Sequence, residues 1–221
     1  MADRQRVVLA SQSQARRRML ENAGLTFDVV PSHVDEVAMR SAFEPERALD
    51  EDYPAEVAEM LAAAKATDVS VKFPDALVIG CDQVLALATE RRMEIGGKPW
   101  SAASYEILEK PADLEAARVH LSRLRGRTHQ LHACVAVAFG GEIQWTCTDS
   151  AELTMRDFSD GFLVQYLARA GARVCESVGA YQLEGLGVQL FEQITGDYFT
   201  ILGMPLLPLL EELRERGVVA T

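Results

Sequence analysis

The sequence lacks the marks of several common protein classes. Its 221 residues contain no apolar run that approaches the ~20 residues of a membrane-spanning helix. The first residues, MADRQR, lead straight into an apolar segment without a signal region. Lys and Arg form no basic tail or face, and the formal net charge is −11. We therefore expect no membrane partner and no nucleic-acid polymer, because a polymer needs clustered cations to neutralise its phosphates.

Cysteine is also scarce. The four cysteines show no CxxC spacing and sit in apolar or strand-like contexts, at positions 81, 134, 147 and 175. Such thiols are typical of buried side chains in a reducing compartment, so we expect a cytoplasmic protein.

The chain has no internal repeat or low-complexity segment, and its hydrophobic share of 48% suffices for a sizeable core. The length of 221 residues suits one large α/β domain or two small lobes.

The segment from Val7 to Leu20 carries the strongest local signal. It predicts a short buried strand, a turn rich in hydroxyl and amide groups, and a helix that Ser11 or Ser13 can cap. A helix start exposes unpaired N–H groups and the positive end of the dipole, so anions bind there. Three arginines follow: Arg16, Arg17 and Arg18. Because successive helical residues point about 100° apart, at most one or two of them can face one ligand. The alternative is a capped amphipathic helix with solvated arginines.

Apolar periodicity and turn residues predict an alternation of strands and helices. Strands are expected at residues 7–10, 27–30, 76–79 continuing through 85–87, 105–108, 129–139, 143–153 and 188–194. Helices are expected at residues 13–23, 54–67, 114–124, 160–169 and 205–216. Between these elements lie an acidic, irregular stretch at 37–53, a long hairpin containing 89–104 and a glycine-rich loop at 179–187.

Eight sequence strings occur in an order and spacing that together are highly specific. They are LASQSQARR, HVDE, LAAAKA, IGCDQV, LEKPADLEAA, GRTH, VGAYQLEGLG and GDYFTILGMPL. From Val7 to Leu213 the chain resembles the Maf family of nucleoside triphosphate pyrophosphatases. The resemblance implies a single domain over residues 1–221. The implied fold is an elongated, two-lobed α/β fold of the Maf and ITPase kind, with a mixed central sheet, flanking helices and a deep central cleft. It also implies metal-dependent hydrolysis of a nucleoside triphosphate to the monophosphate and pyrophosphate.

Two departures from the family pattern bear on the site. The first family motif usually reads SxSPRR, whereas here Gln14 replaces the proline and Ala15 the first arginine, and Arg16 keeps the second. The family lysine lies in a K-P pair soon after the catalytic aspartate, and this chain has two such pairs, at Lys98 and Lys110. Only the second is followed by ADLEAA, so Lys110 is assigned and residues 89–104 are treated as an insertion.

The resemblance implies that Asp82 accepts a proton and that Glu36 supports a divalent metal bound to both carboxylates. Hard oxygen ligands favour Mg²⁺ or Mn²⁺. We expect Asp82 at the C-terminal end of a central strand, where α/β sheets present ligand-binding groups. The alternatives are a turn residue for Asp82 and a solvated loop carboxylate for Glu36, for which Asp35 could substitute.

Arg16, Lys65 and Lys110 are the predicted contacts of the phosphate chain, since guanidinium forks and lysine ammonium groups bind phosphate oxygens. Ser11 and the N–H groups after it complete the cradle. Lys65 is expected in the last turn of its helix, where the alternative role is to offset the helix dipole.

Base choice depends on Ala15, Gln83 and Glu184. The resemblance implies that the dTTP/UTP branch has a threonine at the position of Gln83 and a glutamine at the position of Glu184. DQ and SEGLG are features of the 7-methyl-GTP branch. Guanine presents N1–H and N2–H₂ side by side, which a carboxylate can accept, whereas uracil and thymine present two carbonyl oxygens there. Against this, Ala15 replaces the tryptophan usual in that branch, and the GAY at 179–181 belongs to the other branch.

The sequence thus predicts an enzyme acting on a guanine-type or modified triphosphate such as 7-methyl-GTP. The alternatives are a dTTP/UTP pyrophosphatase and a non-catalytic nucleotide sensor acting in septum formation. A homodimer is possible. His129 and His132 are not expected to share a metal, because strand residues three apart face opposite sides. Cys81 is expected to be a packed thiol rather than a nucleophile.

Overall fold

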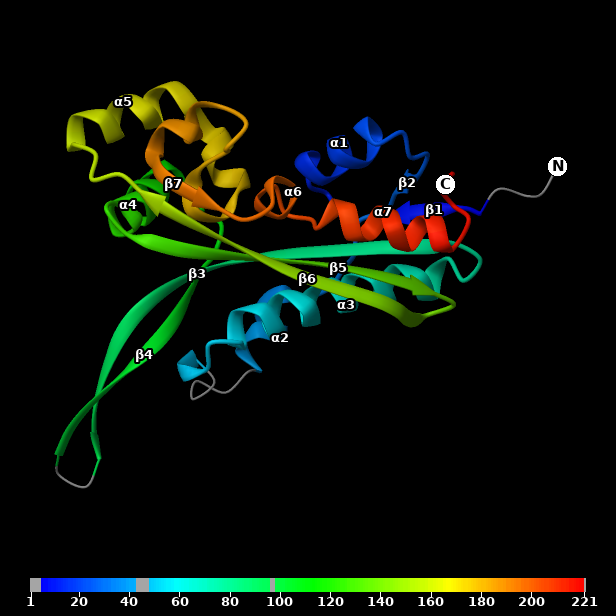
Figure 1. The fold of residues 1–221 in the computed structure, drawn as a ribbon, viewed down its shortest axis with the longest axis horizontal. Coiled ribbons are helices and arrows are strands. Elements are labelled where there is room, and N and C mark those ends of the chain that lie inside the picture. Colours follow the sequence, from blue (N-terminus) through cyan, green and yellow to red (C-terminus); the bar gives the residue numbers. More distant parts are fainter. Residues whose placement is uncertain (1–4, 43–47, 96–97, 221) are drawn as a thin grey trace.

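The computed structural model describes residues 5–42, 48–95 and 98–220. A seven-stranded mixed sheet lies at its centre, in the order β2-β1-β3-β5-β6-β7, with β4 paired to β3 (Figure 1). The strands are β1 (Val7–Leu9), β2 (Asp28–Val29), β3 (Leu77–Ile95), β4 (Lys98–Leu108), β5 (Thr128–Phe139), β6 (Glu142–Met155) and β7 (Phe191–Thr195). Strand β1 pairs in parallel with β2 and β3, and the other pairings are antiparallel. The predicted mixed α/β sheet with flanking helices is confirmed.

Helices cover both faces of this sheet. The α-helices are α1 (Gln14–Asn22), α2 (Glu36–Ser41), α3 (Tyr53–Lys72), α4 (Leu114–Leu124), α5 (Asp160–Ala170), α6 (Tyr198–Ile201) and α7 (Leu206–Glu215). Three 3₁₀ helices, η2 (Gly171–Glu176), η3 (Val178–Ala180) and η4 (Leu186–Leu190), precede β7. Helices α2 and α3 lie on one face, and the remaining helices lie on the other (Figure 1). In the described part of the chain, no helix is both long and apolar enough to span a bilayer.

The face opposite α3 carries two separate apolar cores along the same strands. Near one end, α1 and α7 pack on Ile79 and Cys81 of β3. Near the other end, α4, α5 and the 3₁₀ helices pack on Leu85 and Leu87 of the same strand. Residues of a strand that are two apart share a face, so Gln83 lies between the two cores. Two groups of helices therefore stand on one sheet face with Gln83 at the boundary between them.

An opening in the sheet edge lies beside the same stretch of β3. On that side β3 pairs with β1 as far as Ile79, and with β4 only from Leu85 onward. Between these residues no described strand covers that edge. This opening corresponds to the C-terminal end of the parallel strand β1, the kind of position at which open α/β sheets bind ligands.

The prediction that Asp82 ends a strand is wrong, because β3 continues to Ile95. On one edge, β5 pairs with β3 from Val78 to Ala86. On the opposite edge, β4 pairs with β3 from Leu85 onward in a regular antiparallel ladder that reaches Lys98. The insertion at 89–104 thus forms paired strands of one long hairpin, which projects from the body (Figure 1).

Three other element boundaries were also predicted wrongly. Helix α3 runs on to Lys72, supported by an i,i+4 ion pair between Asp68 and Lys72, so Lys65 is internal rather than in the last turn. The stretch at 37–53, expected to be irregular, includes most of α2, although residues 43–47 lie outside the described residues. Residues 188–190 belong to η4, and β7 begins only at Phe191.

Candidate active site

Lys65 joins the two carboxylates that the sequence singles out. Its Nζ lies 2.6 Å from Oδ1 of Asp82 and 2.8 Å from Oε1 of Glu36. Lys65 and Asp82 are buried, whereas the Glu36 side chain is 41% exposed. A buried ammonium and carboxylate each need a partner, because an unpaired charge in the interior is strongly destabilising. The structure therefore brings Glu36, Lys65 and Asp82 into one charged cluster.

Helix α2 presents Glu36 to this cluster, although the helix itself buries no residue. Asp35 caps it by accepting a hydrogen bond from the Ala38 N–H at 2.9 Å. At its other end, Arg40 forms an ion pair of 2.9 Å with Glu109, the residue before Lys110. Asp35 acts as the helix cap, whereas Glu36, the first residue of the helix, reaches the site.

The pKa values of Glu36, in the cluster, and of Lys110, beside it, are both shifted. Partial burial acts to raise the pKa of Glu36, but the hydrogen bond from Lys65 and the charges of Lys65, Arg40 and Lys110 outweigh it, so the pKa is lowered. Burial, together with the nearby charges of Arg16 and Lys65, lowers the pKa of Lys110 despite the opposing effect of the two carboxylates. Neighbouring cations thus lower the pKa of Glu36, whereas burial is the main cause of the lowered pKa of Lys110 and the neighbouring cations add to it.

Arg16 faces the opening in the sheet edge, but its guanidinium is largely hydrogen-bonded to other groups of the protein. Its Nε donates to the Gly203 carbonyl at 2.8 Å, and its Nη1 donates to the Cys81 carbonyl at 2.8 Å and to Ser11 Oγ at 3.4 Å. Ser13 caps α1 by accepting from the Arg16 N–H, which leaves Ser11 beside the guanidinium. Burial raises the pKa of the Cys81 thiol to about 11, so Cys81 is a packed thiol, as predicted.

A cleft of about 600 Å³ lies beside these groups. Ser11, Arg16, Glu36, Lys65 and Lys110 all line it. Asp82 does not line it, because Lys65 stands between this carboxylate and the open space. Lys98 is the first residue of β4, and its side chain lies outside the described residues.

A smaller pocket of about 70 Å³ adjoins the cleft, and all three predicted base-specificity residues line it. Ala15 enters from α1, Gln83 from β3 and Glu184 from the loop between η3 and η4. Ala15 and Glu184 also line the main cleft, so the two spaces lie next to each other. The amide nitrogen of Gln83 donates to the carbonyls of Thr200 and Ile201, both at 3.0 Å. Gln83 therefore holds α6 beside the pocket. Glu184 is an exposed carboxylate that lines the same pocket.

Buried hydrogen bonds anchor the loop that carries Glu184. Tyr181 Oη lies 2.7 Å from Nε2 of His129, and Tyr166 Oη donates to the Ala180 carbonyl at 3.2 Å. Burial lowers the pKa of His129 to about 4, so this imidazole is neutral at pH 7. His132 instead bonds Ser150 at 2.8 Å, and His129 and His132 do not share a site, as predicted.

The carboxylates of Glu36 and Asp82 suit a hard divalent cation. Each has one oxygen bonded to Lys65, and the second oxygen of each is of the type that Mg²⁺ and Mn²⁺ bind. In the described part of the chain, no third His, Cys, Asp or Glu completes a metal cluster. Mg²⁺ usually keeps several waters and is bound through one or two carboxylates together with phosphates, so two carboxylates suit it.

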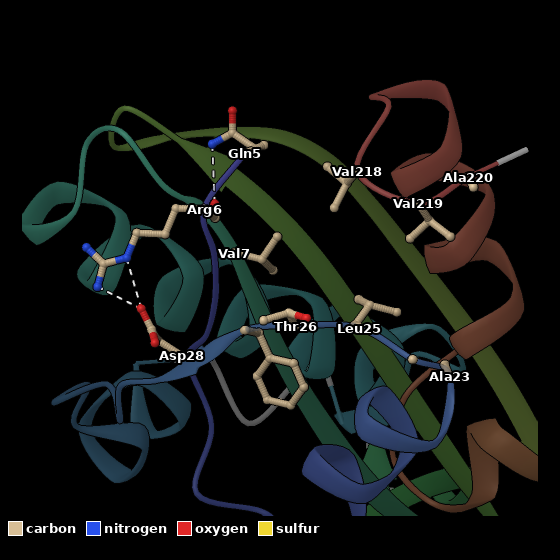
Figure 2. Close-up of a pocket in the computed structure, with 12 residues that line it drawn as sticks. Gln5, Arg6, Val7, Ala23, Leu25, Thr26, Asp28, Val218, Val219 and Ala220 are labelled. Carbon is tan, nitrogen blue, oxygen red and sulfur yellow. Dashed lines mark hydrogen bonds and ion pairs between the residues drawn. The ribbon is translucent and has the colours of Figure 1, made fainter. Parts of the chain in front are cut away.

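A second cavity, of about 490 Å³, lies at the other end of α1 (Figure 2). Its walls are largely apolar, from Val7, Leu25 and Val218 among others. Its charged residues, Arg6 and Asp28, already pair with each other at 2.8 Å. This cavity contains none of the predicted site residues.

Sequence reasoning missed one cation in the main cleft and did not single out another. Arg173, in η2, lines the cleft from the second group of helices. Arg18 lines it from α1, whereas Arg17 points elsewhere and pairs with Glu21 at 2.7 Å. The helical spacing predicted that the three arginines could not all face one ligand, but no motif marks Arg173.

Comparison with known proteins identifies the family of this chain. The family profile described as Maf-like protein matches residues 6–216. A relative from Mesorhizobium japonicum, named 7-methyl-GTP pyrophosphatase, is 46% identical over 215 residues, which cover 97% of this chain and 98% of the relative. A Brucella suis protein with the same name is 47% identical over 214 residues, covering 97% and 98%. A Paramagnetospirillum magneticum protein named nucleoside triphosphate pyrophosphatase is 47% identical over 210 residues, covering 95% and 98%. The chain therefore belongs to the Maf family.

Proposed function

We propose that this protein hydrolyses a nucleoside triphosphate to the monophosphate and pyrophosphate. The observation that carries the proposal is the pairing of Lys65 with both Glu36 and Asp82 at the wall of a cleft lined by further cations. A chain with a net charge of −11 gathers positive groups in this cleft, as a polyanionic substrate requires. The names of the relatives, which cover almost the whole chain, agree with this activity.

Different residues have different roles in the proposed reaction. Lys110 and Arg16 hold the phosphate chain, which converts hydrolysis into a reaction between positioned groups. Lys65 covers Asp82, so attraction of its ammonium to a bound phosphate would uncover that carboxylate. Asp82 then accepts the proton of the attacking water at Oδ1, the oxygen that Lys65 releases. A divalent cation bound by Glu36 and Asp82 would supply charge neutralisation on the phosphates and a more acidic bound water.

The pocket beside the cleft supports a guanine-type base, such as that of 7-methyl-GTP. Glu184 is the carboxylate in this pocket, and it can accept from N1–H and N2–H₂ of guanine together. A uracil or thymine would place carbonyl oxygens against the same carboxylate. The positive ring of a 7-methylated guanine would also be attracted to it.

We further propose Mg²⁺ or Mn²⁺ as the metal and the cytoplasm as the location. The four cysteines are all unpaired, and Cys81 and Cys134 are buried, which suits a reducing compartment. The homodimer stays a prediction.

A substrate panel tests the proposal. The full-length protein is incubated with 7-methyl-GTP, GTP, dTTP or UTP in Mg²⁺ or Mn²⁺, and released pyrophosphate is measured. We expect turnover of the guanine nucleotides, loss of turnover with a chelator, and none in Asp82→Asn. Hydrolysis of dTTP and UTP alone would support the pyrimidine branch instead. Binding of nucleotides without any turnover would support a sensor and contradict the enzyme.

A further inference from the structure

Two of the three cations predicted to bind phosphate are already engaged within the protein. Lys65 is bonded to Glu36 and Asp82. Arg16 uses its Nε and Nη1 on the backbone carbonyls of Gly203 and Cys81 and on Ser11. A nucleoside triphosphate carries about four negative charges, each phosphate offering several strong acceptors. Among the described residues, Lys110 is therefore the one cation of the predicted set without such an engagement.

Arg18 is exposed on α1 and faces the same space. Gln14 and Ala15 also line the cleft, and Arg18 is four and three residues beyond them. Residues three or four apart share a helix face, so Arg18 belongs to the face that lines the cleft. Among the described residues, no carboxylate pairs with its guanidinium, in contrast to Arg17, which is bonded to Glu21.

Arg173 is an exposed arginine on η2 in the other group of helices. Its backbone is fixed close to the base pocket, because its carbonyl accepts a hydrogen bond of 3.4 Å from the Gln182 side chain, and Gln182 lines both spaces. In the part of the chain that the structure describes, its guanidinium too has no carboxylate partner. As far as the structure is described, the cleft thus has on each side a guanidinium without a carboxylate partner.

We propose that Arg18 and Arg173 bind the phosphate chain of the nucleotide from opposite sides of the cleft. This inference rests on the proposed function for the identity of the ligand. Each guanidinium can donate two parallel hydrogen bonds to phosphate oxygens, which lysine cannot do. Because the two arginines come from different groups of helices, a bound phosphate chain links the two groups. Their contact is with phosphate, so it contributes equally for every base.

The test compares Arg18→Gln, Arg173→Gln and the double variant with Arg17→Gln as the matched control. Titration calorimetry with inorganic tripolyphosphate in the presence of Mg²⁺ measures phosphate binding without any turnover. We expect about tenfold weaker binding in each single variant and about a hundredfold in the double variant. Arg17→Gln should bind as the wild type does. Thermal unfolding confirms that all four variants are folded.

Steady-state kinetics give the second readout. The KM should rise by the same factor for every hydrolysed triphosphate, with kcat changed less than KM. Unchanged tripolyphosphate affinity in the double variant, or no binding by the wild type, would overturn the inference. Loss of tripolyphosphate binding in a protein that hydrolyses no triphosphate would instead keep this anion site and contradict the proposed enzyme.

Discussion

Gly80 of β3 lies directly against the backbone of Ala62 in α3. A Cβ atom at residue 80 would be 2.4 Å from the Ala62 carbonyl oxygen and 2.6 Å from the Ala66 nitrogen. Glycine therefore allows helix and strand to approach more closely than any side chain would permit. Residues 80 and 82 share a strand face, so this approach also brings Lys65 of α3 to Asp82.

Gly80→Ala should damage both stability and activity. The obstacle is backbone, which cannot rotate away, so α3 must move outward from β3. Overpacking of this kind costs about 1–3 kcal/mol, and the movement lengthens the bond between Lys65 and Asp82. Urea unfolding and pyrophosphate release measure the two effects. Gly161→Ala is the matched control, since the nearest atom to its Cβ would be 3.8 Å away. Equal unfolding free energies for the two variants would contradict the packing argument.

The parts of the fold with strong local signals were predictable from the sequence. Helices α1, α4 and α5 have side-chain caps at Ser13, Asp113 and Ser159, and the β5–β6 hairpin turns at two glycines with positive φ. The full length of β3 was not predictable, because its polar second half is a strand only through pairing with β4. Helix α2 was missed because it buries no residue and depends on its cap and on ion pairs with distant residues.

The resemblance singled out residues that the structure brings together at or beside one cleft, but it did not indicate how they are bonded. The bond between Arg16 and the Gly203 carbonyl joins residues far apart in sequence, as does the hydrogen bond between Gln83 and Thr200. No local pattern reports such contacts. Arg173 carries no motif at all, and only the packing of η2 places it at the cleft. A place at or beside the cleft was therefore predictable where a motif exists, and the hydrogen bonding of the cations was not.

Glu184→Gln should change the base preference rather than the overall rate. An amide can donate to a uracil or thymine carbonyl but loses the bidentate acceptor that guanine needs. A good bidentate pair is worth about 1–3 kcal/mol of discrimination. We therefore expect the ratio of kcat/KM for GTP or 7-methyl-GTP over UTP to fall about tenfold or more. Glu176→Gln is the control, since Glu176 lines the cleft but not the base pocket. A ratio that changes equally in both variants would argue against direct base contact.

Glu36 and Asp35 are adjacent carboxylates with different tasks, and substitution should separate them. Glu36→Gln removes an oxygen ligand of the proposed metal. The Mn²⁺ or Mg²⁺ concentration needed for half-maximal activity should rise at least about a hundredfold, because even outer partners of metal ligands contribute 10–100-fold. Asp35→Asn keeps a residue that caps helices well, so its metal dependence should match the wild type. If Asp35→Asn shows the larger loss, Asp35 is the ligand and Glu36 is not.

Folding stability should fall as the pH is lowered from 7 to 5, largely because of His129. Burial lowers its pKa in the folded protein to about 4 from the ordinary 6.5, so the unfolded chain binds the proton first. The stabilisation is complete above pH 6.5 and is lost as the pH falls toward 4. The slope approaches about 1.4 kcal/mol per pH unit, and the total is on the order of 3 kcal/mol.

The window above pH 5 isolates this effect from the carboxylates, whose ordinary pKa values lie lower. His132, whose pKa burial also lowers, adds a contribution of the same sign. Urea unfolding of the wild type and of His129→Gln across this range measures the difference. The variant should be less stable at pH 7, because the buried contact with Tyr181 changes, yet its stability should depend less on pH. Parallel curves for the two proteins would mean that His129 has the same pKa in the folded and unfolded states, and the loop carrying Glu184 would then pack on a charged imidazole below about pH 6.5.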